Sequence, residues 1–480
     1  MATHSQSVRG AHESRSDLVG ALGSVEPGEP IRRIGRLTDM KGRFLVLVAM
    51  AMVVAACANA VDGTGSTLDR GPSGGRAESA PTSGSDTPAR PQVAALVPTD
   101  GVDRSDPLVD ARLGDLVTGM NNAGFELWQI QPRKENLVFS PASIGNGMLM
   151  VRAAADDITG SAIDSTFGFP PGLEAHQAWN ATEQLIASDA AAQAEITVTI
   201  ADRVWPGLDA VPDQAWIDLL AAEHGASIET LDFVGASEPS RDAINSWVGD
   251  QTDGLIPELL PEGSIGDDTI LVLTDAVYFK APWQIQFGKY ASVIDDFVLP
   301  SGSTIEVEYM RELELADRRG AGDGFVGAEI PYVGGDFSML VIVPEAGRFD
   351  EVRDRLDQTL LDEIDATFTV GPYELLIPQW ATASEIDLVG WLTQIGAAPG
   401  LYPSIDPQAW LDGAVHGADV TVDGWGTVAA AATSITFASS GPPEPEFTVK
   451  ADRPFLYLIR HRVTGLVLFA GQVSDPTAGN

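Results

Sequence analysis

The sequence predicts an α+β domain built mainly from antiparallel sheets. Helical spacing of apolar residues appears early, as in Leu108–Trp128, whereas strand-like segments gather in the later part of the chain. Phe455–Ile459 and Leu466–Phe469 have the pattern of paired strands with a turn at Thr464-Gly465. Thr269–Lys280 is a long, nearly continuous apolar strand, which is typical of the middle of a sheet covered on both faces.

The other expected elements follow from the same patterns. Ser140 precedes Pro141 and is placed to cap a helix, and Ser384 is placed to cap another. Helices are expected over Gly145–Ala154, Asp242–Val248 and Glu385–Leu392, and strands over Leu137–Phe139, Ile196–Trp205, Thr304–Met310, Phe325–Pro331, Phe337–Pro344 and from Val420.

The composition is globular and strongly acidic. The chain has 480 residues, 44% of them hydrophobic, and a formal net charge of -39. This charge argues against nucleic acid or an anionic membrane surface as the main partner, since both attract positive charge. Cys57 is the only cysteine, so a disulfide within the chain is excluded.

The first 57 residues have the features of a processed signal. Phe44–Ala56 is an apolar run that follows a short basic start and is too short to span a bilayer. Val54-Ala55-Ala56-Cys57 resembles a bacterial lipobox, in which the cysteine accepts lipid. We therefore interpret residues 40–57 as a lipoprotein signal peptide, and residues 1–39 as an upstream start artefact or disorder. An ordinary secretory signal with a chance cysteine is the alternative.

Residues 58–105 are rich in Gly, Ser, Pro, Thr and Asp and contain few large apolar residues. Such a segment cannot bury enough surface to offset the cost of ordering, so we expect a disordered linker. The folded domain is expected over residues 106–476, with a short tail at 477–480. A lipid on Cys57 would tether this domain outside the cell, at the cell surface.

Several ordered motifs spread over residues 106–475 resemble the serpin family. They begin with Asn136–Ile144 and end with a C-terminal signature around Asp452–Phe455. The others are Ile244–Val248 with Thr252–Ile256, Leu271–Phe287, Ile330-Pro331-Tyr332, Ser338–Leu340 with Val343-Pro344, Thr464-Gly465 and Phe469–Gly471.

The resemblance implies a serpin fold with a large, mostly antiparallel central sheet, smaller sheets, about eight to nine helices and an exposed reactive-centre loop. It implies a suicide-substrate inhibitor of serine-type proteases, not an enzyme. The protease serine attacks the loop and forms an acyl-enzyme, and the loop then inserts into the main sheet as a strand. A covalent complex with a serine protease is the expected partnership. The inhibitor itself is expected to be a monomer without cofactor or metal.

An Ala-rich segment from Gly426 to Thr433 resembles the hinge of that loop. Gly426 allows the chain to bend, and small side chains can slide between packed strands. Strand alternation places Thr427, Ala429, Ala431, Thr433, Ile435 and Phe437 on one side, and Ala430, Ala432, Ser434, Thr436 and Ala438 on the other. The first set ends in large apolar residues suited to burial. A surface helix is the alternative, because Ala favours helix.

Two features depart from the family pattern. Inhibitory members usually carry an acid at the position of Gly424 and often at that of Val428. Trp425, next to the hinge, is expected either to slow insertion or to pack onto the sheet.

Family spacing along the loop places the scissile bond at Ser440-Gly441, with Ser439-Ser440 as the runner-up. Small residues there favour an elastase-like or subtilisin-like protease. The absence of a basic residue argues against a trypsin-like target. Phe437 would suit a chymotrypsin-like target but would shorten the inserted strand.

Four residues match a polar cluster that controls opening of the main sheet in the family: Ser140, Ser143, Asp275 and His416. The position of Asp275 is normally Asn. We hypothesise that Asp275 forms an ion pair with His416, which makes loop insertion sensitive to pH. A satisfied core histidine is the alternative reading of His416.

Catalytic motifs are weak. A Gly-x-Ser-x-Gly sequence lies at Gly71–Gly75, inside the linker, where no strand or helix can form a nucleophile elbow. No metal-ligand spacing is present. The alternative function is a non-inhibitory serpin that acts as a binding protein, although such members usually carry bulky or charged residues where Ala429–Ala432 stand.

Overall fold

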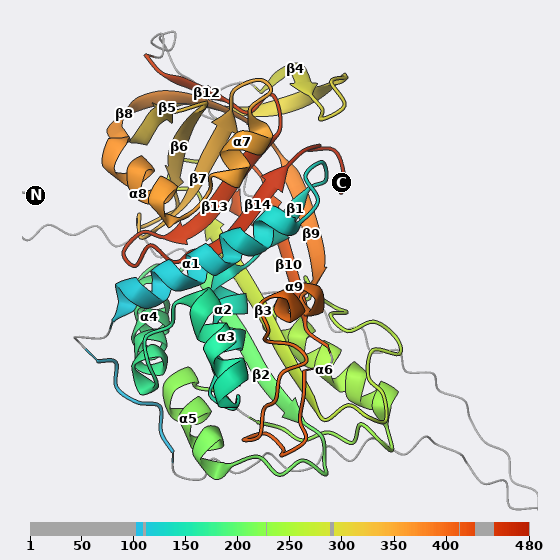
Figure 1. Cartoon of the computed structure of the whole chain (residues 1–480). Coiled ribbons are helices and arrows are strands. Elements are labelled where there is room, and N and C mark those ends of the chain that lie inside the picture. The colour runs from blue at the N-terminus through green and yellow to red at the C-terminus, as the bar shows by residue number, and fades with distance from the viewer. Residues whose placement is uncertain are drawn as a thin grey trace, which may run out of the picture. The chain divides into compact units, whose positions relative to one another are not determined.

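The computed structural model describes residues 102–108, 112–226, 228–288, 292–411, 413–427 and 446–479, with the side chains of all of these except 201, 202, 275 and 314. Within this part of the chain, nine helices and two sheets form a mixed α+β fold (Figure 1). The predicted fold class is confirmed. None of the helices in these ranges is long and apolar enough to cross a membrane.

The helices surround the two sheets and most lie in the first half of the described chain. Their bounds are α1 Leu113–Ile130, α2 Pro141–Arg152, α3 Asp157–Phe167, α4 Leu173–Ala191, α5 Gln214–His224, α6 Ser237–Gln251, α7 Phe349–Asp354, α8 Gln358–Thr367 and α9 Val389–Gln394. Ser140 caps α2 as predicted, because its hydroxyl accepts the backbone N–H of Ser143 at 3.1 Å.

The larger sheet has the strand order β1-β14-β13-β7-β6-β5-β8-β12, and β4 adds to it by pairing with β5. Only β12 and β8 are parallel among its pairs in the described residues. Its strands are β1 Leu137–Phe139, β4 Val293–Val298, β5 Thr304–Gly322, β6 Phe325–Pro331, β7 Phe337–Pro344, β8 Thr369–Pro378, β12 Thr448–Lys450, β13 Phe455–His461 and β14 Val467–Val473.

The second sheet has the order β2-β3-β11-β10-β9. Its strands are β2 Thr197–Pro206, β3 Leu271–Pro282, β9 Trp380–Asp387, β10 Val415–Val422 and β11 Gly426–Thr427. Helix α2 is buried nearly throughout and packs on one face of β2 and β3, whereas α6 packs on their opposite face. As predicted from its apolar run, β3 is a central strand covered on both faces.

The helix expected over Glu385–Leu392 is wrong in its first half and begins only at Val389. Residues up to Asp387 belong to β9, and the helix that follows is the shorter α9. Trp380, Thr382 and Ile386 alternate as buried residues, so a period of two prevails over the helical pattern. Ser384 does not cap a helix; its hydroxyl accepts the backbone N–H of Val138 in β1 at 3.1 Å.

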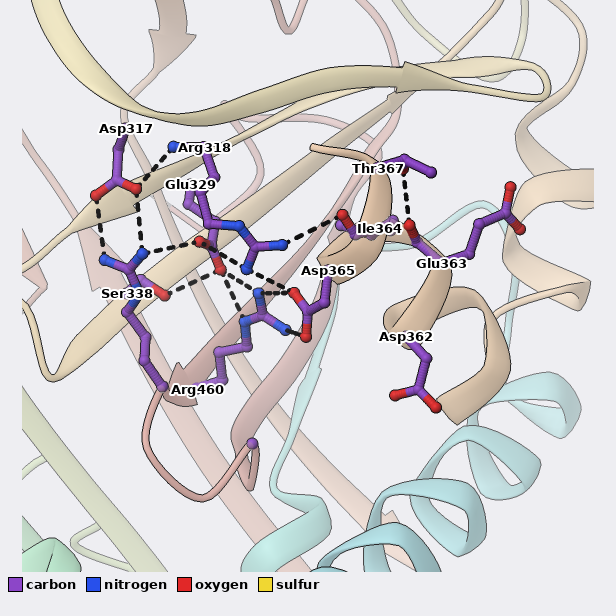
Figure 2. A network of polar contacts seen from close by, with 12 residues as sticks. Asp317, Arg318, Glu329, Ser338, Asp362, Glu363, Ile364, Asp365, Thr367 and Arg460 are labelled. Atoms are coloured by element: carbon purple, nitrogen blue, oxygen red, sulfur yellow. Dashed lines mark hydrogen bonds and ion pairs between the residues drawn. The ribbon is translucent and has the colours of Figure 1, made fainter. Parts of the chain in front are cut away.

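An ion network joins three strands of the larger sheet to helix α8 (Figure 2). Glu329 of β6 is almost fully buried and contacts the guanidinium groups of Arg460, Arg318 and Arg462. Asp365 of α8 is 2.7 Å from both Arg460 and Arg318. These contacts link β5, β6, β13 and α8. Strand β13, near the end of the chain, is therefore attached to strands that lie much earlier in the sequence.

The residues that precede α1 are also attached to the fold. Arg104 Nε donates to Asn180 Oδ1 of α4 at 2.8 Å. The backbone N–H of Ser105 donates to the carbonyl of Ala222 in α5, and its hydroxyl donates to Glu223, both at 2.8 Å. Arg104 and Ser105, which were expected to end the disordered linker, are therefore hydrogen-bonded to the folded domain.

Candidate functional site

The central feature of the five-stranded sheet is the short strand β11, which lies between β3 and β10. Gly426 and Thr427 pair antiparallel with Pro282 and Ala281 of β3, and Thr427 also pairs with Val422 of β10. The start of the predicted hinge therefore already occupies a place within the sheet. The two flanking strands are separated here only by these two residues.

Thr427 is fixed inside the sheet by its side chain. It is 0% exposed, and its hydroxyl is hydrogen-bonded to the hydroxyl of Tyr332 at 2.7 Å. Gly426 is required by close approach, because a Cβ there would lie 2.1 Å from the carbonyl oxygen of Ala281. A residue with any side chain at position 426 would force β3 and β11 apart.

A tight turn at Asp423 directs the chain from β10 back into β11. The Asp423 carboxylate accepts the backbone N–H groups of Trp425 at 2.7 Å and Gly426 at 3.2 Å. Its own N–H donates to the carbonyl of Gly426 at 3.0 Å. Asp side chains stabilise turns in this way, so Asp423 sets the direction in which the hinge enters the sheet.

Two aromatic residues support this turn from below. Trp283 stacks on Tyr332 with ring centroids 4.5 Å apart, and both are buried. The indole N–H of Trp283 donates to the carbonyl of Asp423 at 2.9 Å, and its backbone N–H donates to that of Trp425 at 2.8 Å. Sequence reasoning placed Trp283 and Tyr332 in family motifs but gave them no role; the Asp-Gly-x-Gly sequence at Asp423 was the signal for the turn.

Gly424, the first departure from the family pattern, and Trp425 beside it form the top of the turn, whereas Val428, the second departure, lies outside the described residues. Gly424 accepts the backbone N–H of Phe287 at 2.9 Å through its carbonyl. Trp425 is half-buried; its backbone N–H donates to the Asp423 carboxylate, and its carbonyl accepts the backbone N–H of Trp283. The two behaviours expected for Trp425, slower insertion or packing onto the sheet, stay predictions.

Below β11 the flanking strands meet directly. Gly417 of β10 pairs in parallel with Ala276 of β3. The segment after α6 packs closely against this pair. A Cβ on Gly417 would come within 2.7 Å of Leu259 Cδ1 in that segment. A longer strand between β3 and β10 would have to replace the pairing of Gly417 with Ala276.

The predicted polar cluster lies under this closed part of the sheet. Ser140, Ser143 and His416 are all essentially buried. The Ser140 backbone N–H donates to Nε2 of His416 at 3.0 Å, which joins the start of α2 to β10. Three of the four predicted residues are therefore together; the backbone of Asp275 is in the adjacent β3, and its side chain lies outside the described part.

Burial lowers the pKa of His416 from 6.5 to about 3. The hydrogen bond from Ser140 acts in the same direction, because Nε2 accepts it through the lone pair that a proton would need. The imidazole is neutral at neutral pH. The charged pair with Asp275 stays a prediction, because the side chain of Asp275 lies outside the described part.

The remaining predicted site residues lie outside the described residues. They are Cys57, Ala429, Ala430, Ala431, Ala432, Thr433, Ser439, Ser440 and Gly441. Among the side chains that the structure does describe, no group of three or more His, Cys, Asp or Glu residues is placed to hold a metal ion.

Comparison with known proteins agrees with the fold. The family model "Serpin (serine protease inhibitor)" matches residues 119–476, and the chain belongs to the serpin family. It is 27% identical over 374 residues to an uncharacterized serpin-like protein of Methanosarcina acetivorans, which covers 75% of this chain and 86% of that protein.

Two solved structures share the fold. The native state of the thermophilic serpin tengpin is 21% identical with a TM-score of 0.70, covering 79% of this chain and 99% of that one. Thyroxine-binding globulin in complex with thyroxine is 23% identical with a TM-score of 0.65, covering 75% and 99%. Members of the family are generally protease inhibitors, and some bind other molecules instead.

Proposed function

We propose that this protein is a suicide-substrate inhibitor of serine-type proteases, in which the segment after Thr427 inserts between β3 and β10 when a protease cleaves it. The observation that carries the proposal is the position of β11. Gly426 and Thr427 already lie between the two strands, and the buried Thr427 points into the core. This position supports the proposal, because an inserted strand would continue from residues that are already paired in the sheet.

The register of β11 defines how insertion would continue. Each further loop residue would pair with one earlier residue of β3 and one earlier residue of β10. Continued in this way from both neighbours, Ala432 falls opposite Ala276 and Gly417, which now pair with each other. The pairing with β3 and the pairing with β10 therefore place the inserted strand in the same register. Ala432, a small residue, would take the place between Ala276 and Gly417, which now pair directly.

The same register gives roles to the larger residues. Thr433 would reach the level of Asp275 and His416, so the polar cluster would have to accommodate it. Ile435 would fall opposite Leu273 and Ala414, which line a cavity of about 20 Å³ over α2. Burial of Ile435 and Phe437 would supply part of the free energy that drives insertion ahead of hydrolysis.

The target that we propose is an elastase-like or subtilisin-like protease, cleaving at Ser440-Gly441 or, one residue earlier, at Ser439-Ser440. Both bonds follow small residues that suit a narrow specificity pocket. Mixing the protein with such a protease should give a covalent complex that survives SDS. Sequencing of the released C-terminal peptide identifies the bond.

A pair of neighbouring substitutions tests the mechanism itself. If the register of Thr427 with Ala281 continued, Val428 would lie opposite Lys280 on the side of β3 away from the core, and Ala429 would face the core beside the buried Phe279. Val428→Glu should therefore keep the SDS-stable complex, and Ala429→Glu should be cleaved without forming it, since insertion would bury an unpaired carboxylate. Equal behaviour of the two variants would contradict strand insertion.

A binding role without inhibition is the second candidate, and it follows from the relatives rather than from the site. Thyroxine-binding globulin shows that the fold serves binding in that protein. Clean cleavage of the wild-type loop to a nicked chain, with active protease remaining, would favour this candidate.

We also propose that the protein is a bacterial lipoprotein held outside the cell by lipid on Cys57, with residues 58–105 as a tether and the serpin domain as a monomer. The lipobox sequence and the composition of the linker support this proposal. Metabolic labelling with a fatty acid tests it, because Cys57→Ser should abolish the label and release the protein into the medium.

A further inference from the structure

The hairpin formed by β4 and β5 exposes one face that no other described element covers. Residues of this face alternate with buried ones such as Phe297, Val307 and Tyr309, so the hairpin has a core side and an open side. The open side consists of Ile294, Asp296, Val298, Thr304, Glu306 and Glu308, all of them exposed. Ile294 is 71% exposed, which is unusual for a large aliphatic side chain in a strand.

The charges on this face are arranged against the stability of the hairpin. Asp296 and Glu306 are direct cross-strand partners, and like charges placed opposite each other are destabilising. Ile294 is opposite Glu308, so it has no apolar partner across the strands. Neither arrangement helps the hairpin to fold, and both are suited to contact with another molecule.

The hairpin contacts the returning end of the segment that carries the predicted scissile bond, and the chain just before the hairpin contacts the entering end. On the entering side, Gly424 accepts the N–H of Phe287, and a Cβ on Gly424 would lie 3.9 Å from Met310 of β5. On the returning side, Lys450 of β12 pairs with Asp295 at 2.7 Å, and the carbonyl of Asp452 accepts the N–H of Val298. Figure 1 shows β4 beside β12 at the end of the molecule farthest from α6.

From this placement we propose that the open face of β4 and β5 is a docking surface for the target protease, and that it selects enzymes with a basic rim and an apolar contact beside the active-site cleft. This inference rests on the proposed function. A protease that engages the loop must lie next to the hairpin, because the returning end of the loop is attached to β4 and the entering end to Phe287, just before it. The carboxylates supply attraction before contact, and Ile294 supplies apolar area afterwards.

The test compares two double variants that remove the same charges. Asp296→Asn/Glu306→Gln neutralises the docking face, and Asp250→Asn/Glu262→Gln neutralises two exposed acids at α6 and the segment after it. Association rate constants are measured with a strongly basic elastase and with an acidic subtilisin-like protease, at about 0.02 M and 0.5 M salt. The two concentrations separate screened from unscreened attraction.

The hairpin variant should associate about tenfold more slowly with the basic protease at low salt, and the difference should vanish at high salt. The control variant and the acidic protease should show changes below twofold. Equal loss in both variants would attribute the effect to overall charge and overturn the proposal. If the wild type forms no SDS-stable complex, the proposed inhibition fails; the rate of loop cleavage then replaces the association rate, and its dependence on the same variants still decides the docking face.

Discussion

The pH dependence of stability distinguishes a neutral His416 from a charged one. A neutral, buried imidazole has a pKa of about 3 in the folded protein, against 6.5 when it is exposed in the unfolded chain. The unfolded state then binds a proton below pH 6.5 that the folded state does not. Stability from His416 is complete above pH 6.5 and is lost as the pH falls toward 3.

The size of the effect follows from the two pKa values. Between pH 7.5 and pH 5.5, His416 should lower the free energy of unfolding by about 1.4 kcal/mol, roughly one pKa unit of linkage. Few carboxylates titrate in this range, so histidines dominate it. His176, whose pKa is lowered to about 4 by burial, should contribute a similar loss.

Urea unfolding at the two pH values measures this, with His416→Gln as the reference because its amide oxygen can still accept the Ser140 N–H. The variant should lose about 1.4 kcal/mol less than the wild type over the same range. An ion pair with Asp275 would raise the pKa of His416, and the wild type would then gain stability relative to the variant as the pH falls. A wild type that gains stability relative to His416→Gln at low pH would refute a neutral imidazole. Asp275→Asn should then abolish this gain.

Further substitutions test the hinge and the sheet. Gly426→Ala should displace β11 and raise the stoichiometry of inhibition, the number of inhibitor molecules consumed per protease molecule inhibited, severalfold in a gel titration. An unchanged stoichiometry would contradict the close approach of residue 426 to the Ala281 carbonyl. Thr427→Val should cost about 1–3 kcal/mol in urea unfolding because the Tyr332 hydroxyl is left buried without its partner. Adding Tyr332→Phe should recover most of that loss; simple additivity would argue against the hydrogen bond. Glu329→Gln should cost about 3–5 kcal/mol, since it leaves buried guanidinium charge unbalanced. Glu351→Gln, on the surface, should cost under about 1 kcal/mol, and similar values for the two would contradict a buried network.

The sequence was sufficient for elements whose pattern has one interpretation. The apolar run of β3 and the cap of α2 by Ser140 were both predictable, since burial on two faces and the Ser-Pro helix start are local signals. The segment from Glu385 to Leu392 was not. Its polar residues fit a helix start, whereas the strand depends on pairing with β10, which is distant in sequence.

The site was predictable in its composition and less so in its geometry. Small residues after Gly426 indicated a strand that can insert, and Ser140, Ser143 and His416 could be named from family motifs. The depth to which Thr427 enters the sheet depends on Tyr332 and on the turn at Asp423. These contacts join three separate segments of the chain, so no local pattern contains them.

The order of the strands along the chain has a consequence for the product of cleavage. Both β13 and β14 follow the predicted scissile bond, yet they lie in the interior of the larger sheet. A cut at Ser440 would turn one polypeptide into two, and the contact of Glu329 with Arg460 would become a contact between separate molecules. The nicked inhibitor would then be a heterodimer whose small subunit supplies two interior strands of a sheet, so it should remain assembled until the whole fold is denatured.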